Sequence, residues 1–161
     1  MTQVVITGRG VVSSIGEGVD TFFDALLKKQ SGIADGIGAC VDFDPEVAMS
    51  PKEARRSDRY TQLAVAAAVQ AAEEAKLPDG VDPERLGVLV GTGVGGLATL
   101  QNECQAWLEG GDRAVSPHFV PMMMPNAAAG TIAMRLGAQG PGFSVSSACA
   151  TGGTRSARRR G

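Results

Sequence analysis

Short apolar runs alternate with helix-periodic segments along this chain, and no other feature restricts its fold as strongly. Runs with the character of buried strands lie at 4–6, 86–90 and 143–147. Apolar residues at helical spacing lie at 19–29, 57–77, 97–108 and 126–136. A long loop covers 33–51, with a short strand expected near 40–43. Strands that alternate with helices predict an α/β fold.

The helix predicted at 57–77 is expected to be largely buried. Ser57 is its predicted N-cap, because a serine hydroxyl accepts a hydrogen bond from the first helical turn. One stripe of this helix consists of Tyr60, Leu63, Ala64, Ala67, Ala68 and Ala71. The small alanines of this stripe permit close approach by another backbone segment.

Composition narrows the class of protein. The chain has 161 residues, of which 43% are hydrophobic and 20% charged, with a formal charge of −2. These values carry no signature of a nucleic-acid or membrane partner. No secretory pattern and no apolar stretch of about 18 residues is present, so the expected location is the cytoplasm. Three widely spaced cysteines and one histidine predict neither a disulfide framework nor a metal site.

Cys149 follows the last strand-like run and lies among very small residues. The run at 143–147 alternates apolar residues with serines, as a half-buried strand does. The small residues at 148–152 suit a tight turn from strand to helix. A helix N-terminus favours the thiolate, and its N–H groups can hold an oxyanion. Cys149 is therefore a candidate nucleophile, and the alternative is a small buried hydrophobic residue.

Gly91, Gly93 and Gly96 form the pattern G-x-G-x-x-G between a predicted strand and a predicted helix. This context is typical of a dinucleotide-binding loop. Such a loop also needs a second strand that ends in an acidic residue about 20 positions later. Asp112 stands near that distance, but it follows a helix and a glycine stop. The residues favour the simpler interpretation that glycine lets a strand and a helix approach closely.

Seven short segments follow one another in a fixed order, at 4–13, 52–61, 91–96, 116–121, 125–130, 135–141 and 147–152. Together they resemble the elongating type II β-ketoacyl-acyl-carrier-protein synthases of fatty acid synthesis. Each segment alone is a weak signal, and their common order carries the resemblance. It extends over residues 1 to about 153.

The resemblance implies a reaction for Cys149. In this family the matching cysteine takes an acyl chain from acyl-carrier protein as a thioester, and its backbone N–H contributes to the oxyanion hole. Decarboxylation of malonyl-acyl-carrier protein and condensation then depend on two family histidines, which lie beyond residue 161. His118 falls where the family commonly has an aromatic residue, so a structural role is expected for it. The chain alone is expected to be unable to condense.

The resemblance also implies a fold and a partner. The family has a thiolase-like α/β fold of two similar halves, each a mixed sheet with helices on both faces. Residues 1–152 would form a truncated, incomplete N-terminal half with an uncovered sheet face, which predicts aggregation or contact with another chain. The family dimerises through this half, so a homodimer is expected. Acyl-carrier protein is the expected partner, and no cofactor is implied.

Val94 occupies the family's gating position in the glycine loop, where a branched aliphatic residue borders the acyl pocket. This gives the loop a third interpretation, as a mobile segment beside a substrate pocket. The alternative for Val94 is a core residue without a functional role.

Residues 153–161 depart from the family pattern. They include four arginines, where the family continues into a buried apolar helix. Unpaired arginines are too costly to bury, so this segment is predicted to be an aberrant, disordered basic tail. The functional alternative is a noncatalytic partner subunit that resembles a chain-length factor, although such subunits usually lack the cysteine.

Overall fold

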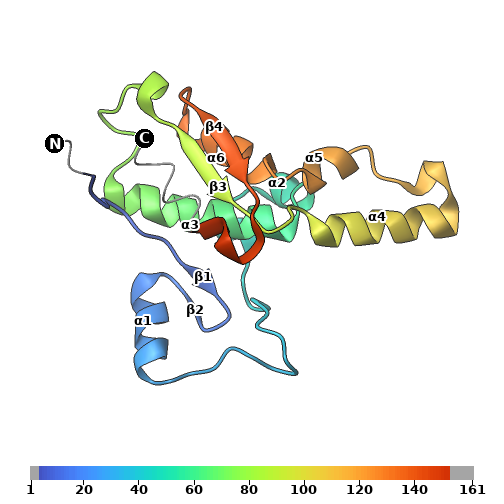
Figure 1. Cartoon of the computed structure of the whole chain (residues 1–161), viewed down its shortest axis with the longest axis horizontal. Helices are drawn as coiled ribbons and strands as arrows, with labels where there is room; N and C mark the ends of the chain where they lie inside the picture. Colours follow the sequence, from blue (N-terminus) through green and yellow to red (C-terminus); the bar gives the residue numbers. More distant parts are fainter. Residues whose placement is uncertain (1–3, 153–161) are drawn as a thin grey trace.

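The computed structural model describes residues 4–152, in which helices alternate with short strands (Figure 1). The helices and strands are β1 (Val12–Ser13), β2 (Gly16–Glu17), α1 (Val19–Leu27), α2 (Pro51–Arg55), α3 (Arg59–Ala75), β3 (Val88–Gly91), α4 (Leu97–Gly110), α5 (Phe119–Met123), α6 (Ala127–Leu136) and β4 (Gly142–Val145). Short 3-10 turns are η1 (Pro45–Val47), η2 (Pro83–Arg85), η3 (Asp112–Ala114) and η4 (Ala148–Ala150). The predicted α/β class is confirmed. The predicted basic tail at 153–161 lies outside the described residues.

β3 and β4 form a parallel pair, in which Val88 lies opposite Gly142 and Leu89 lies opposite Phe143. A parallel pair needs a long crossover, and here α4, α5 and α6 provide it. Side chains alternate across a strand, so Val88 and Val90 share one face, which packs against α6. Phe143, on the opposite face, is 39% exposed. Val145 lies on the same face and is buried, so this face is only partly accessible to solvent, and the uncovered sheet face that the resemblance implies stays a prediction.

The core lies between α3, α6 and the inner face of β3. Val65 of α3 and Ala128 of α6 are completely buried. The other buried apolar residues grouped around α3 and α6 are Phe43, Ala48, Met49, Ala54, Ala66, Val88, Ala129 and Ile132. Many of these side chains are alanine, which lets the two helices pack closely against each other.

Residues 8–11 lie along α3, and two glycines allow this contact. A Cβ atom on Gly8 would stand 2.0 Å from the carbonyl oxygen of Ala71, and one on Gly10 would stand 1.9 Å from that of Ala67. No side chain fits at such distances, so the backbone reaches the helix only where glycine is present. The prediction that the alanine stripe admits another backbone is confirmed.

Polar groups of α3 hold the same segment in place. The N–H of Val11 donates to the Oε1 of Gln70 at 2.9 Å, and the N–H of Arg9 donates to Glu74 at 2.6 Å. The guanidinium of Arg9 also donates to the Glu74 carboxylate at 2.6 Å. These bonds hold the N-terminal segment parallel to the helix surface.

The strand predicted at 4–6 is absent, and this prediction is wrong. Ile6 is 83% exposed, and Val4 and Val5 are also exposed. No strand pairs with these residues among those that the structure describes. A strand needs a hydrogen-bonded neighbour, whereas this part of the chain finds its partners on α3, through residues 8–11.

The strand expected near 40–43 is also absent. Instead, the guanidinium of Arg59 donates to the carbonyl oxygens of Cys40 at 2.6 Å and Phe43 at 3.0 Å. The same guanidinium lies 4.8 Å from the centroid of the Phe43 ring. Because Arg59 satisfies carbonyl groups that a neighbouring strand would otherwise pair with, the loop needs no ladder.

The carboxylate of Asp58 caps two helices at once. Its Oδ1 accepts a hydrogen bond from the N–H of Tyr60 at 3.1 Å, in the first turn of α3. Its Oδ2 accepts from the N–H of Thr99 at 2.8 Å and from the Thr99 hydroxyl at 2.7 Å, in the first turn of α4. Helix N-termini are electropositive, so one buried carboxylate stabilises both. The prediction of Ser57 as the cap is wrong, because α3 begins at Arg59 and Asp58 occupies its N-cap position.

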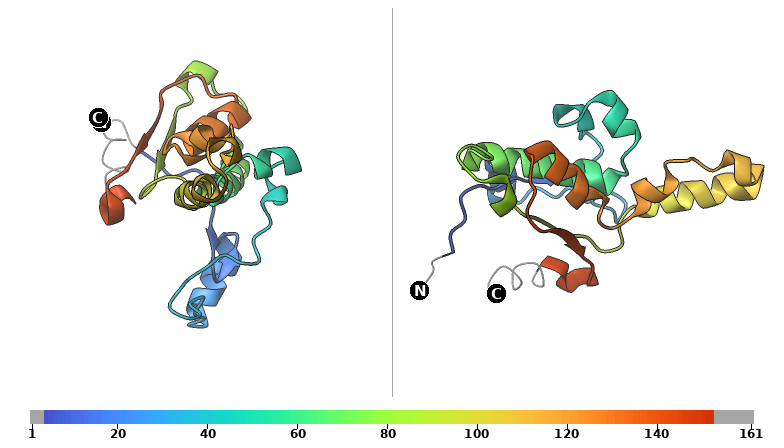
Figure 2. Two further views of the ribbon diagram at one scale, coloured as in Figure 1. Left: turned by 90° about the vertical axis from the view of Figure 1, so that its right-hand side faces the viewer. Right: turned by 90° about the horizontal axis from the view of Figure 1, so that it is seen from above.

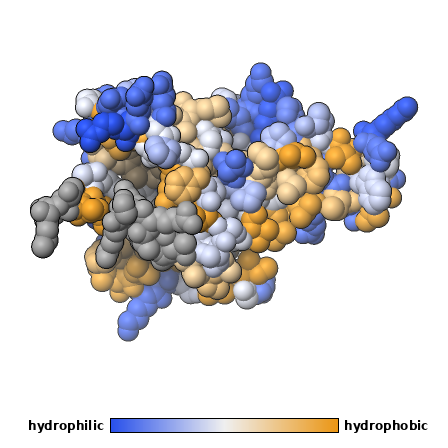
Figure 3. Space-filling model, turned by 45° about the horizontal axis from the view of Figure 1, so that its top comes forward, coloured by the Kyte–Doolittle hydropathy of each residue, from blue (hydrophilic) through white to orange (hydrophobic). Residues whose placement is uncertain are grey.

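Large apolar side chains face solvent on elements outside the core. They are Phe23, Leu26 and Leu27 on α1, Leu97, Trp107 and Leu108 on α4, and Val120 on α5. Figures 1 and 2 show α1 with β1 and β2 projecting to one side of the core, and α4 extending from its end. Hydrophobic surface is visible toward the end of the molecule that α4 and α5 form (Figure 3). Exposed apolar area of this kind marks an interaction surface or an aggregation hazard.

Among residues 4–152, no helix is both long enough and apolar enough to cross a membrane.

We expect Asp58→Ala to lower the free energy of unfolding by about 3 kcal/mol, because two helix caps and a buried hydrogen-bond network are lost together. Asp82→Ala removes the cap of η2 alone, where Asp82 accepts from the N–H of Glu84. It should cost about 1 kcal/mol or less. Urea unfolding followed by circular dichroism measures both. Equal costs for the two variants would contradict the double-cap account.

The Arg9 guanidinium, and after it the Arg9 backbone N–H, hold the pKa of the Glu74 carboxyl below its ordinary value of 4.5. The resulting stabilisation is therefore present above pH 4.5 and is lost as the pH falls through the lowered folded pKa. Glu74→Gln should flatten the loss of stability in this acidic window, while Glu73→Gln should not. Urea titrations at stepwise lower pH test this, and identical acid profiles for parent and Glu74→Gln would refute it.

Candidate active site

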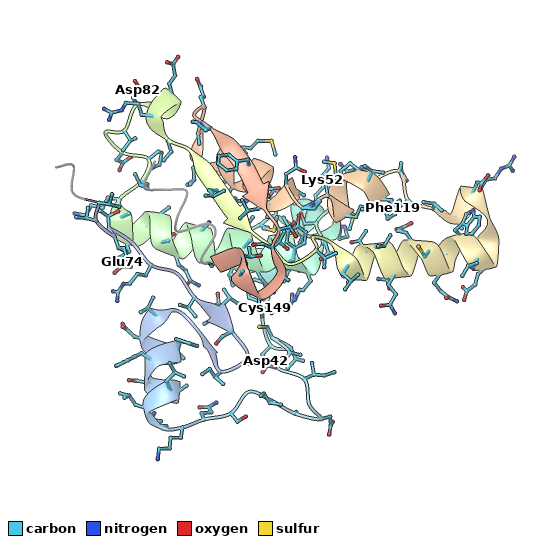
Figure 4. The ribbon with its side chains drawn as sticks, viewed as in Figure 1. Asp42, Lys52, Glu74, Asp82, Phe119 and Cys149 are labelled. Atoms are coloured by element: carbon cyan, nitrogen blue, oxygen red, sulfur yellow. The ribbon has the colours of Figure 1, made fainter. Side chains whose placement is uncertain are left out.

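Cys149 lies in a sharp turn that follows β4. The strand ends at Val145, the 3-10 turn η4 carries the cysteine, and helical residues begin at Thr151 (Figure 4). Ala148 has φ 47°, a left-handed conformation that costs a residue other than glycine about 1–2 kcal/mol. The thiol is exposed. The predicted geometry, a strand followed by a tight turn that exposes a cysteine, is confirmed, and the role of Cys149 as a nucleophile stays a prediction.

The side chain of Thr151 closes the turn around Cys149. Its Oγ1 accepts a hydrogen bond from the backbone N–H of Ser147 at 2.9 Å. Inside this ring, the N–H of Ala150 donates to the carbonyl oxygen of Ser147 at 3.0 Å. Thr151 is 7% exposed, so its hydroxyl makes these contacts largely out of water. The backbone on both sides of the cysteine is thereby held by protein groups.

The glycine loop, residues 91–96, lies directly against this turn. The N–H of Thr92 donates to the carbonyl oxygen of Val145 at 3.1 Å and so continues the pairing of β3 with β4. The hydroxyl of Ser146 donates to the carbonyl oxygen of Gly93 at 2.6 Å. Two segments that are some fifty residues apart in the sequence are thus joined by hydrogen bonds at the cysteine turn.

The far end of the glycine loop packs on the segment between α5 and α6. The N–H of Gly96 donates to the carbonyl oxygen of Met123 at 3.0 Å. Gly95 has φ 100°, and a Cβ atom there would stand 2.7 Å from the same oxygen. Only glycine can adopt this conformation at this distance. Val94 stands between the two contacts of the loop and is 59% exposed.

Val94 and Cys149 are therefore carried by two segments that contact each other. Val94 is not a core residue, because more than half of its surface is exposed. The role of Val94 beside an acyl chain stays a prediction.

The dinucleotide interpretation of the glycine loop is wrong. A pyrophosphate would have to bind the N–H groups at the start of α4. The carboxylate of Asp58 already accepts from the N–H of Thr99 there, and the N–H of Gly96 is bonded to Met123. A buried negative charge at this position repels a phosphate. Gly91 and Gly96 serve close packing, because a Cβ atom there would stand 2.4 Å from Thr151 and 2.6 Å from Met122, whereas a Cβ atom on Gly93 would meet nothing within 4 Å.

His118 lies at the N-cap of α5, where its carbonyl oxygen accepts from the N–H of Met122 and its N–H donates to the Ser116 hydroxyl. Phe119, the next residue, lies well away from Cys149 (Figure 4). The structural role expected for His118 agrees with these contacts.

We also searched the described residues for a metal site and for a surface hollow near Cys149. Among the residues that the structure describes, no group of three histidine, cysteine, aspartate or glutamate side chains is placed to hold a metal ion. A shallow hollow is lined by Gly80, Val81, Asp82 and Arg85. Figure 4 shows Asp82 at the opposite end of β3 from Cys149, so this hollow is not part of the cysteine site.

Sequence reasoning missed Thr151 and Ser146 as residues of the site. Both belong to the small-residue stretch around Cys149, but only their partners reveal their roles. One signal was available, because Thr151 is a β-branched hydroxyl residue between Ala150 and Gly152. Such a residue in a tight turn usually makes a hydrogen bond to the nearby backbone.

Comparison with known proteins identifies a family. Residues 35–157 match the family model described as "Beta-ketoacyl synthase, N-terminal domain". A 3-oxoacyl-[acyl-carrier-protein] synthase 2 from Vibrio cholerae serotype O1 is 38% identical to this chain in an alignment 163 residues long. The alignment covers 93% of this chain and 39% of the relative. The chain thus spans about two fifths of the length of the curated relatives that it matches.

Two solved structures share the fold. One is a type II PKS acyl-carrier protein in complex with its ketosynthase bound to the hexaketide, with a TM-score of 0.77 and 23% identity over 94% of this chain and 43% of that chain. The other is the ishigamide ketosynthase/chain length factor, with a TM-score of 0.76 and 30% identity over 88% of this chain and 39% of that chain. These likenesses confirm the predicted thiolase-like α/β fold. Because the family model covers most of the sequence, the chain belongs to the beta-ketoacyl synthase family and carries that family's N-terminal domain.

Proposed function

We propose that this chain supplies the acyl-accepting part of a 3-oxoacyl-[acyl-carrier-protein] synthase, with Cys149 as the nucleophile. One observation carries the proposal: the exposed thiol of Cys149 lies in a strained turn directly after β4, held by hydrogen bonds from the turn itself and from the glycine loop. A backbone held in this way presents a side chain in a fixed direction. Membership of the family makes acyl transfer the chemistry to test.

The proposed step is transfer of an acyl group between two sulfur atoms. The Cys149 thiolate attacks the carbonyl carbon of an acyl thioester, and the new carbon–sulfur bond forms as the carrier's thiolate leaves and takes up a proton. Negative charge gathers on the carbonyl oxygen in between, and the backbone N–H of Cys149 is the donor that we propose for it. The donor substrate that we propose is acyl-carrier protein charged with an acyl chain.

Condensation would follow on the acylated enzyme. A malonyl thioester loses carbon dioxide, and the carbanion attacks the Cys149 thioester, which releases the thiol and forms a 3-oxoacyl product. This step needs acid–base groups beside the sulfur. The single histidine, His118, lies at α5 instead. We therefore propose that this chain alone accepts an acyl group without condensing it.

We propose that Val94 borders the bound acyl chain. Its side chain is exposed in the glycine loop. Of the two residues next to Val94, Gly93 accepts a hydrogen bond from Ser146 in the cysteine turn, and Gly95 donates one to the hydroxyl of Thr92. An exposed branched aliphatic side chain beside a nucleophile can limit how far an apolar substrate enters.

Further assignments follow from the same proposal. We propose a homodimer in which the exposed apolar side chains of α4 and α5, including Leu108 and Val120, are covered. We propose fatty acid synthesis as the pathway and the cytoplasm as the location, where the three free thiols remain reduced. No nucleic-acid or membrane partner is proposed.

The second candidate is a noncatalytic partner subunit like a chain-length factor. The likeness to the ishigamide ketosynthase/chain length factor favours it. Selective reaction of Cys149 separates the two candidates, since a noncatalytic subunit has no need of an acylated thiol.

Incubation with an acyl thioester should load an acyl group on Cys149 at least about 100-fold faster than on Cys104. Cys104 is the matched control, because both thiols are exposed. Peptide mass spectrometry locates the added mass, and Cys149→Ala should abolish it while Cys104→Ser leaves it unchanged. Equal labelling of the two cysteines, or none, would contradict the proposal and favour the noncatalytic subunit.

Val94→Phe should slow the loading of long acyl chains by about tenfold or more, with a smaller effect on short ones, because added volume in the loop that contacts the cysteine turn would shorten the space for the chain. Val94→Ile adds a single methylene group and serves as the control. Loading rates for a series of acyl thioesters measure the effect. A uniform change for all chain lengths would show that Val94 does not border the acyl chain.

A further inference from the structure

We propose that Thr151 is a positioning residue for Cys149. We also propose that position 91 requires glycine because the methyl group of Thr151 fills the space that a side chain there would need. The inference rests on the proposed acyl transfer at Cys149, and it assigns roles to two residues outside the nucleophile itself. Thr151 acts through the backbone of the turn and touches no substrate.

The hydroxyl of Thr151 joins three parts of the site. It accepts from the N–H of Ser147 at 2.9 Å and lies 3.5 Å from the Ser147 hydroxyl. It also lies 3.5 Å from the carbonyl oxygen of Thr92 in the glycine loop, to which it donates. The first of these bonds joins the two ends of a five-residue ring with Cys149 at its centre.

The methyl group of Thr151 fills the place of a side chain on Gly91. A Cβ atom on Gly91 would stand 2.4 Å from the Cγ2 of Thr151, inside the 3.0 Å that real Cβ atoms keep. The next atoms of Thr151 would be at 3.5 and 3.7 Å, which is ordinary contact. Gly91 does not have a left-handed φ, so its backbone would accept alanine. Space for one methyl group is therefore the reason for glycine at this position.

Both halves of the Thr151 side chain thus act on the turn. Ala148 is held at φ 47°, a conformation that relaxes unless the surrounding contacts maintain it. The bond to Ser147 supplies one such contact, and the fit against Gly91 supplies another. If the turn relaxes, the sulfur of Cys149 and its N–H both move. Acyl transfer needs both atoms in place, whereas simple alkylation needs only an exposed thiol.

Thr151→Val keeps the shape of the side chain and removes its hydroxyl, so we expect acyl loading of Cys149 to fall by roughly 10- to 100-fold. Alkylation by iodoacetamide should stay within about threefold, because the thiol remains exposed. Thr151→Ser keeps the hydroxyl but loses the methyl contact with Gly91, so its loading should lie between that of Thr151→Val and that of the parent. Thr131→Val removes a hydroxyl that bonds within α6, and it is the control for loss of a threonine hydroxyl elsewhere. Loading within about twofold of the parent in Thr151→Val would overturn the proposal.

Gly91→Ala tests the other half of the side chain. It should lower acyl loading by about tenfold or more, and Thr151→Ser added to it should restore loading because the clashing methyl group is gone. Gly130→Ala is the control, since a Cβ atom at Gly130 of α6 meets nothing within 4 Å. Failure of Thr151→Ser to rescue Gly91→Ala would overturn the assignment of Gly91. Circular dichroism of every variant identifies any that fails to fold.

Hydrogen exchange separates this inference from the proposed function. The amide of Ser147 should exchange about tenfold faster in Thr151→Val than in Thr151→Ser, because only the serine variant keeps its acceptor. This measurement needs no acyl donor. If the parent chain does not load an acyl group but the Ser147 amide responds, the proposed function fails and the role of Thr151 in holding the turn stands. Unchanged exchange in Thr151→Val overturns that role whatever the loading result.

Discussion

The hydrogen bonds of the buried Asp58 carboxylate determine the positions of the other elements of the site. It accepts hydrogen bonds from the first turns of α3 and α4, and so it sets where α4 begins relative to the core. The glycine loop must then connect the end of β3 to that fixed point. A Cβ atom on Gly96 would stand 2.6 Å from the carbonyl oxygen of Met122, so the loop can pack on α5 at this point, next to the Asp58 carboxylate, only without a side chain. The cysteine turn packs on this loop, so the two helices determine where the turn lies.

Local patterns were sufficient to predict most of the fold. The helices α1, α3, α4 and α6 lie where apolar spacing and glycine stops place them, and β3 and β4 follow from short apolar runs. The tight turn at Cys149 was predictable because only small residues surround the thiol. The alanine stripe of α3 predicted a close backbone contact, which Gly8 and Gly10 make. In each case the information lies within a few consecutive residues.

The two strand predictions that failed depend on partners far away in the sequence. Residues 4–6 are apolar enough for a strand, but pairing, not composition, makes a strand, and the contacts of this segment are with α3. The loop at 40–43 is held by Arg59, whose reach no periodicity reveals. The same limit applies to the site. The methyl group of Thr151 packs against Gly91, sixty residues earlier, and no local pattern reveals this contact.

We propose that Cys149 is an acyl-accepting nucleophile whose turn also supplies the oxyanion donor. A crystal structure of the chain after reaction with an acyl thioester tests both parts at once. We expect a thioester on the Sγ of Cys149, with its carbonyl oxygen about 3 Å from the Cys149 backbone nitrogen. An unmodified Cys149, or a thioester whose oxygen points away from that nitrogen, would contradict it.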